Sequence, residues 1–125
     1  MRLLLDTHVL LWWLSDEEKL TSEARDAIAD PENTIYLSAV VVWEIRIKEA
    51  IGKLSLPDAF IETLARQAFV ELPITVEQAD EISRLPDIHR DPFDRLLIAQ
   101  AVVEDLTIIT RDSVIPDYPV RVVSA

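Results

Sequence analysis

The sequence predicts an α/β fold in which helices cover both faces of a central parallel sheet. Two features of the chain indicate this. Short apolar runs that suit strands alternate with segments of helical periodicity along the whole length. The runs are apolar at nearly every position, as strands buried on both faces should be. A length of 125 residues, half of them hydrophobic, suits one domain spanning 1–125.

Capping and turn residues mark where these elements begin and end. Asp6, Ser38 and Asp91 each stand directly before a periodic apolar segment, where an oxygen-bearing side chain caps a helix. Pro92 suits the first helical position, and Gly52, the only glycine, is predicted to stop the helix that Ser38 begins. In chain order, strands are predicted at 3–5, 35–37, 70–72, 107–110 and 120–123, and helices at 7–14, 21–29, 39–51, 58–69, 76–84 and 92–104.

Composition excludes several classes of protein. The chain has no cysteine, which rules out disulfides and thiolate metal sites and fits a reducing compartment. The apolar opening, 3–14, is too short to cross a bilayer and lacks the features of a signal peptide, so we expect a cytoplasmic protein without a membrane segment. A single glycine excludes glycine-rich phosphate loops. The net charge of −11 offers no basic footprint for nonspecific binding to nucleic acid.

Four acidic residues from distant parts of the chain are predicted to meet at one rim of the sheet. Ligands of open parallel sheets lie beyond the carboxyl ends of the strands. Asp6 directly follows the first strand, and Asp112 follows the strand 107–110 after one residue. Glu44 lies nearly two turns into the helix after the second strand, and Asp94 lies in the first turn of the helix 92–104.

Such a cluster predicts a metal site. Carboxylates that crowd together repel one another unless cations lie between them. Ligands that are all oxygen select hard ions, here Mg²⁺ or Mn²⁺. Two such ions can activate water and stabilise the leaving oxygen when a phosphodiester is cleaved.

Each acid also has a structural interpretation. Capping a helix would by itself account for Asp6. At the third helical position, the charge of Asp94 interacts favourably with the helix dipole, and Asp112 suits a turn. For Asp91 the cap is the preferred interpretation. Glu44 is the most telling of the set, because a carboxylate among large apolar neighbours invites a functional reason.

Four motifs of the chain resemble those of PIN domains. They are Leu3–His8 with its Asp6, Ser38–Ile45 with its Glu44, His89–Ala101 with its Asp94, and Thr110–Asp112. The resemblance extends over the whole chain in the right order. It implies a three-layer α/β/α PIN-like fold and RNA cleavage that depends on Mg²⁺ or Mn²⁺. Stand-alone domains of this size resemble VapC-type toxins of type II toxin–antitoxin pairs. That implies a homodimer held inactive by a small antitoxin, which places a basic side chain near the acidic site.

Carried over residue by residue, the resemblance implies a role for each matching position. Asp6, Glu44 and Asp94 match the metal-binding acids, and Asp112 matches a fourth acid in less direct contact. Supporting positions are Thr7, Ser38 and the additional acid Asp91, whereas His8 and His89 are interpreted as capping or core residues and not as ligands. Cations near the motifs that are candidates for contacts with RNA phosphates, or alternatively for solvated faces and salt bridges, are Arg46, Lys48, Arg90, Arg95 and Arg111.

The sequence leaves other functions to weigh. A receiver domain needs two acids after its first strand and a lysine after its fifth, and this chain has no lysine beyond Lys53. A noncatalytic PIN-fold module that acts through a partner has no use for clustered carboxylates, which destabilise a fold. A DNA-directed nuclease of the same fold class carries further acids and DNA-gripping helices, so a chain of this length favours RNA. Trp12, Trp13 and Trp43 suit a core or a dimer interface better than base stacking.

Overall fold

A parallel sheet of five strands forms the centre of the structure. A computed structural model describes residues 1–89 and 91–125. The strands lie in the order β3-β2-β1-β4-β5, and each neighbouring pair is parallel. Their bounds are β1 Arg2–Leu5, β2 Thr34–Ser38, β3 Val70–Leu72, β4 Thr107–Thr110 and β5 Arg121–Ser124.

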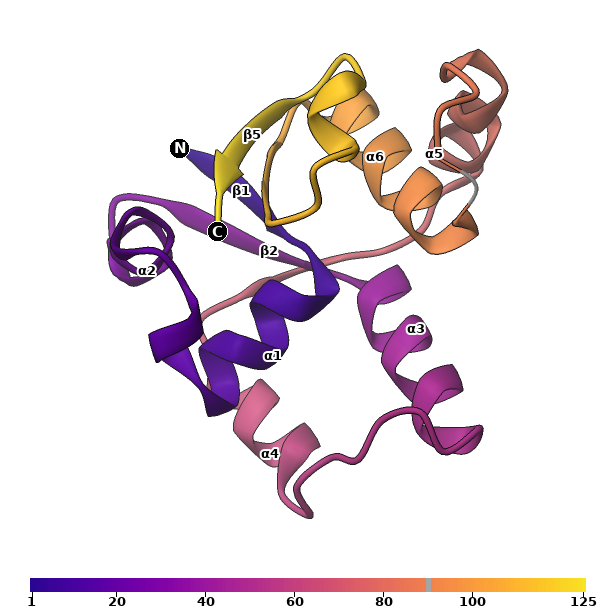
Figure 1. Cartoon of the computed structure of the whole chain (residues 1–125). Coiled ribbons are helices and arrows are strands. Elements are labelled where there is room, and N and C mark those ends of the chain that lie inside the picture. Colours follow the sequence, from indigo (N-terminus) through magenta and orange to yellow (C-terminus); the bar gives the residue numbers. More distant parts are fainter. Residues whose placement is uncertain (90) are drawn as a thin grey trace.

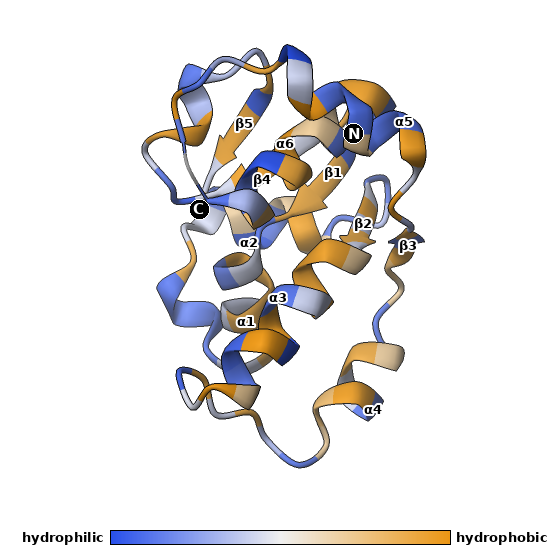
Figure 2. Cartoon of the chain, turned by 90° about the vertical axis from the view of Figure 1, so that its right-hand side faces the viewer, coloured by the Kyte–Doolittle hydropathy of each residue, from blue (hydrophilic) through white to orange (hydrophobic). Residues whose placement is uncertain are grey.

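Helices connect the strands and cover the sheet on both sides. Helices α5 and α6 lie on one side of the strands and α2 lies on the other (Figures 1 and 2). The α-helices are α1 Thr7–Ser15, α2 Ser22–Ala29, α3 Ala39–Ala50, α4 Phe60–Ala65, α5 Val76–Glu81 and α6 Pro92–Glu104. The predicted three-layer α/β/α fold class is therefore confirmed.

The central strands are buried completely because helices pack on both of their faces. Leu3, Leu4 and Leu5 of β1 and Ile108 and Ile109 of β4 are fully shielded from solvent. Figure 2 shows these two strands in the hydrophobic colours. An uninterrupted apolar run is thus what the fold requires here, and it is the pattern that predicted the strands.

The observed elements differ from the predicted ones mainly in length. The helix predicted at 58–69 is observed only over Phe60–Ala65, where its first residue follows a cap without a side-chain hydrogen bond. The helix predicted at 76–84 ends at Glu81 and continues as a 3-10 turn, Ile82–Arg84. Further 3-10 turns at Glu17–Lys19 and Ile115–Asp117 were not predicted. Gly52 has a φ of 78°, a left-handed conformation that glycine adopts without strain, just after α3.

The register of the sheet brings the acidic motifs to one edge. Leu5 of β1 pairs with Ile109 of β4, so the residues that follow them, Asp6 and Thr110, emerge side by side. The main-chain N–H of Asp6 donates to Ile109 O at 3.1 Å, which fixes this alignment. The carboxyl ends of the central strands therefore deliver Asp6 and the segment after β4 to the same place. Within the described residues, no helix has the length and apolar character that crossing a membrane requires.

Candidate active site

A cavity of about 320 Å³ lies at this edge of the sheet. All four acids predicted to converge line it: Asp6, Glu44, Asp94 and Asp112. Thr7 and Asp91 also line the cavity, whereas Ser38 lies outside it. The convergence expected from strand order is thus observed, and the roles of these side chains in chemistry stay a prediction.

Asp6 is buried and held by hydrogen bonds to both of its oxygens. It caps α1, accepting the N–H of Thr7 at 2.7 Å through Oδ1. Its Oδ2 accepts the hydroxyl of Thr110 at 2.6 Å. Burial raises the pKa of Asp6, and the hydrogen bonds from Thr110 and Thr7 oppose that shift. The carboxylate is therefore fixed in one orientation at the floor of the cavity.

Glu44 lies on α3 and is also buried, with a side chain that is 7% exposed. Its Oε1 accepts the hydroxyl of Thr7 at 2.6 Å, which joins the first turn of α1 to α3. Its Oε2 forms an ion pair with Lys48, one turn further along α3, at 2.5 Å. The hydrogen bond to Glu44 raises the pKa of Lys48. Thr7 thus orients Glu44, which is consistent with its predicted supporting position.

Among the four acids, Asp94 has the fewest contacts that stabilise its negative charge. It lies in the first turn of α6, and its side chain is 16% exposed. Burial and the nearby charges of Asp6 and Asp91 raise the pKa of Asp94 to about 7. Asp91 caps α6, as predicted, by accepting the N–H groups of Phe93 and Asp94 at 2.8 and 3.1 Å. The cap therefore places a second carboxylate beside Asp94.

Asp112 is held in a tight turn after β4. Its Oδ1 accepts the N–H groups of Val114 at 2.7 Å and Ile115 at 3.4 Å. Its Oδ2 lies 3.2 Å from Nε2 of His89. Burial alone would raise the pKa of Asp112, but the N–H groups of Val114 and Ile115 and the side chain of His89 together lower it.

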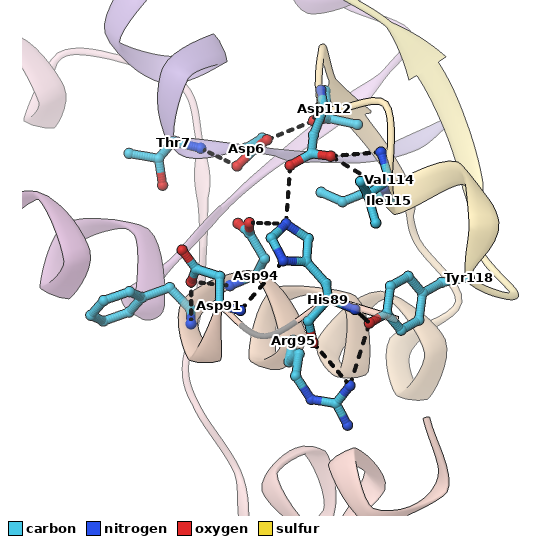
Figure 3. Close-up of polar contacts among 12 residues, drawn as sticks. Asp6, Thr7, His89, Asp91, Asp94, Arg95, Asp112, Val114, Ile115 and Tyr118 are labelled. Atoms are coloured by element: carbon cyan, nitrogen blue, oxygen red, sulfur yellow. Dashed lines mark hydrogen bonds and ion pairs between the residues drawn. The ribbon is translucent and has the colours of Figure 1, made fainter. Parts of the chain in front are cut away.

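His89 was missed as a member of this site. Its Nε2 lies 3.0 Å from Asp94 Oδ2 and 3.2 Å from Asp112 Oδ2, between the two acids (Figure 3). The main-chain N–H of His89 donates to the hydroxyl of Tyr118 at 2.6 Å, and Tyr118 is itself buried. The structure therefore places His89 beside two acids of the site, and the expectation that it is not a metal ligand stays a prediction. Its position five residues before Asp94 was the only signal in the sequence.

A family model for the PIN domain matches residues 3–120. The chain belongs to the PIN domain family. Ribonuclease VapC22 from Mycobacterium tuberculosis is 30% identical over an alignment of 117 residues, which covers 87% of this chain and 85% of that protein.

Solved structures share the fold over nearly the whole chain. VapBC2 from Rickettsia felis, bound to a DNA fragment from its promoter, matches with a TM-score of 0.76 at 14% identity, covering 99% of this chain and 98% of that chain. FitAcB from Neisseria gonorrhoeae matches with a TM-score of 0.67 at 24% identity, covering 96% of this chain and 95% of that chain. At such identities the likeness establishes the fold and carries no statement about activity.

The cations predicted to contact phosphates are distributed unevenly around the PIN-domain site. Lys48 and Arg111 line the cavity. Arg46 lies outside it, paired with Glu49 at 2.8 Å. Arg95 is tied to the main chain through bonds to Pro86 O at 2.9 Å and Ile82 O at 3.2 Å and to the Tyr118 hydroxyl at 3.3 Å. Arg46 and Arg95 therefore lie outside the cavity, and a phosphate contact of either stays a prediction. Arg90 lies outside the described residues.

The tryptophans of this PIN domain have three different environments. Trp12 lines the cavity, and the guanidinium of Arg111 lies 4.3 Å from the centroid of its ring. Trp13 packs against the core and donates from Nε1 to Gln67 at 3.1 Å. Trp43 is 53% exposed and makes an edge contact with Phe93. Trp12 and Trp13 therefore both pack against the core, and Trp12 also borders the cavity, whereas a dimer interface at the exposed Trp43 stays a prediction.

The donor set of the PIN domain fits a divalent cation. The side chains that face the cavity offer carboxylate oxygens, which are the ligands Mg²⁺ and Mn²⁺ prefer. Asp94 is the most available of these acids, because its Oδ1 has no hydrogen-bond partner among the described residues. The other three already accept hydrogen bonds or an ion pair, Asp6 from Thr7 and Thr110, Glu44 from Thr7 and Lys48, and Asp112 from two N–H groups. The raised pKa of Asp94 shows that negative charge at this point is costly without a cation.

In EDTA, the PIN domain is expected to lose stability as the pH rises from about 4 to about 8. Asp94 has a higher pKa in the folded chain, about 7, than the ordinary value of 3.8, so the folded state binds its proton more tightly. The stabilising contribution is complete below about pH 4 and is lost as the pH rises through about 7. A shift of this size corresponds to a change on the order of 3 kcal/mol.

Urea unfolding at pH 5 and pH 8 measures this effect. The difference between the two pH values should shrink in Asp94→Asn, which has no proton to lose. The difference should persist in Asp58→Asn, because Asp58 is exposed and does not line the cavity. Equal pH dependence in all three proteins would show that Asp94 does not titrate as stated.

Proposed function

We propose that this chain is an endoribonuclease that hydrolyses RNA phosphodiester bonds with Mg²⁺ or Mn²⁺. The observation that carries the proposal is that four acids from distant parts of the chain line one cavity, where burial and the charges of Asp6 and Asp91 raise the pKa of Asp94 to about 7. Natural proteins keep such repulsion where a bound cation or a reaction uses it. The likeness to a protein named as a ribonuclease supports RNA as the substrate.

The acids, threonines and cations of the site have different roles in the proposed reaction. Asp6, Glu44 and Asp94 hold the ion, with Asp112 as a fourth acid in less direct contact. Thr7 and Thr110 keep Asp6 and Glu44 in fixed orientations. When bound, the ion supplies a Lewis acid for the phosphate and lowers the pKa of water. Lys48 and Arg111, as the cations of the cavity wall, are placed to bind the phosphates that flank the cleaved bond.

We further propose that the protein is the toxin of a type II toxin–antitoxin pair. The solved structures it resembles include VapBC assemblies and a toxin–antitoxin complex from Klebsiella pneumoniae. A small antitoxin would inhibit the enzyme by placing a basic side chain against Asp94 and Asp6, where it would lower the repulsion and exclude the ion. A cytoplasmic homodimer is the expected form of the toxin.

Cleavage of RNA by the purified chain tests the activity. Single-stranded RNA labelled at one end should be cut internally with Mg²⁺ or Mn²⁺, and EDTA in excess should stop the reaction. The control variant Asp58→Asn, whose charge change lies outside the cavity, should keep the activity. Cleavage that continues in EDTA, or no cleavage of diverse RNAs with either ion, would rule out this function.

Growth of bacteria that express the chain tests its role as a toxin. Induction of the wild-type chain should arrest growth, and induction of Asp6→Asn to the same protein level should not. In this pair one carboxylate oxygen of a buried, cavity-lining side chain is replaced by an amide NH2 group. Matching the protein levels therefore makes the growth of the two strains directly comparable. Unhindered growth with abundant wild-type protein would contradict toxicity while leaving the nuclease proposal intact.

A further inference from the structure

His89 fills the space between two acids of the site. Its Nε2 lies 3.0 Å from Oδ2 of Asp94, on α6, and 3.2 Å from Oδ2 of Asp112, after β4. The three ligand atoms lie within 4.8 Å of one another, and all three residues are partly buried. Figure 3 shows the imidazole inserted between the two carboxylates. A side chain in this position competes with any ion that would join Asp94 to Asp112.

Contacts on the other side of the ring determine which nitrogen carries the proton. Nδ1 of His89 accepts the main-chain N–H of Asp91 at 3.3 Å. A neutral imidazole that accepts at Nδ1 carries its hydrogen at Nε2. The Nε2–H group therefore donates to Oδ2 of Asp112, and Oδ2 of Asp94 lies 3.0 Å from the same nitrogen. A histidine that ligates a metal through Nε2 needs the opposite arrangement, with a hydrogen on Nδ1, so the ring is set up as a donor and not as a ligand.

The backbone of His89 holds this arrangement in place. Its N–H donates to Tyr118, whose hydroxyl also accepts from Arg95 at 3.3 Å. Arg95 is anchored in turn on the carbonyl groups of Pro86 and Ile82. The backbone that carries the ring is therefore anchored by contacts that link the segment before α6 to the turn before β5.

These contacts also determine which carboxylate oxygens of Asp94 and Asp112 are free to bind a cation. Oδ1 of Asp112 accepts two N–H groups, from Val114 and Ile115, and Oδ2 faces the imidazole. Asp94 contacts the ring through Oδ2, and among residues 1–89 and 91–125 its Oδ1 has no hydrogen-bond partner. Mg²⁺ binds oxygen at about 2.1 Å, so an ion shared by the two Oδ2 atoms would need the space of the Nε2–H group.

We propose that His89 acts as a positioning residue that prevents a second ion from binding between Asp94 and Asp112, so that each chain holds a single divalent ion. This inference rests on the proposed metal dependence and makes it more specific. The imidazole N–H binds Asp112 by a hydrogen bond, lies in close contact with Asp94, and takes the place of a cation between the two acids. Asp112 then contributes to the site through its charge and its position and not as a ligand.

Counting bound Mn²⁺ tests the proposal without measuring activity. The EPR signal of free Mn²⁺ in titrations of the purified protein should give one tightly bound ion per wild-type chain. His89→Ala should gain a second ion, because the space between the acids is opened. His89→Gln, whose amide N–H can still donate to both carboxylates, should return the count to one. His8→Ala is the matched control, because His8 is the only other histidine and lines the same cavity, but has no hydrogen bond or ion pair to Asp94 or Asp112 among the described residues, and it should also bind one ion.

Two outcomes would overturn the inference while the proposed function stands. One is a count of two ions in the wild-type chain, and the other is a count of one in folded His89→Ala. A wild-type chain that binds no Mn²⁺ would overturn the proposed metal dependence itself, and the inference with it.

NMR of the wild-type protein provides a test that does not depend on how the variants fold. The chain has two histidines, so long-range ¹H–¹⁵N spectra contain two imidazole patterns, which His8→Ala assigns. His89 should show a protonated Nε2 and an unprotonated Nδ1, and this pattern should persist in saturating Mg²⁺. Loss of the Nε2 hydrogen on addition of Mg²⁺ would show that the ring binds the ion, which contradicts the proposal.

Discussion

Asp94→Asn is expected to lower kcat for RNA cleavage by at least about 10³-fold while making the EDTA-treated protein more stable at neutral pH. Asparagine retains the shape of the side chain and the first turn of α6, but it removes the charge that would bind the ion. Because burial and the charges of Asp6 and Asp91 raise the pKa of Asp94, removing its charge also removes repulsion from the folded state. Activity and stability should therefore change in opposite directions.

Two measurements on the same preparations check this expectation. The first is the rate of cleavage of a labelled RNA at saturating Mg²⁺, and the second is urea unfolding at pH 8 in EDTA. Asp58→Asn should match the wild-type chain in both, because Asp58 is exposed and does not line the cavity. A folded Asp94→Asn that keeps wild-type turnover would show that Asp94 does not hold the catalytic ion. A large loss of stability would instead show that its charge is compensated in the metal-free fold.

The positions of the acids were predictable because the topology of a parallel sheet is encoded in short-range signals. An apolar run followed directly by Asp6, and another followed after one residue by Asp112, place both side chains at the carboxyl edge whatever the order of the strands. Caps gave the helix starts in the same way, since Ser38 and Asp91 accept the N–H groups that their helices leave free. These inferences needed only neighbours along the chain.

Several contacts of the acids were not predictable, because they depend on how segments pack in three dimensions. Thr110 donates to Asp6 across 104 positions, and nothing in its own segment distinguishes it from a strand residue. His89 lies in an irregular segment before α6, where no periodicity constrains its direction. Arg95 was expected at a phosphate, whereas its neighbours in space are carbonyl groups that only the packing of α6 against the preceding turn reveals.

Helix α4 is shorter than its amphipathic pattern predicted. The pattern continues to Phe69, but the helix ends at Ala65. Beyond it the chain must become extended in time for Val70 to pair with Tyr36 of β2. Hydrogen bonds to the sheet replace those of additional helical turns, and pairing between strands is a constraint that a local pattern does not contain.

Gln100→Leu is expected to lower the free energy of unfolding by about 2–4 kcal/mol, since it breaks a fully buried polar network. The amide of Gln100 on α6 accepts the hydroxyl of Ser38 at 2.5 Å and donates to Gln78 Oε1 at 3.0 Å. All three side chains have no exposed surface. Leucine has a similar size, so it leaves the core filled while the hydroxyl of Ser38 loses the acceptor of its hydrogen.

Urea unfolding measures this loss, with Gln67→Leu as the matched control. Gln67 is only partly buried and accepts one hydrogen bond from Trp13, so the same substitution there should cost less than about 1 kcal/mol. Ser38 caps the helix that carries Glu44, and Gln100 lies on the helix that carries Asp94, so the bond between them fixes one acid-bearing helix against the other. Equal unfolding free energies in Gln100→Leu and the wild-type chain would show that packing alone sets this alignment, and that the network contributes nothing net to it.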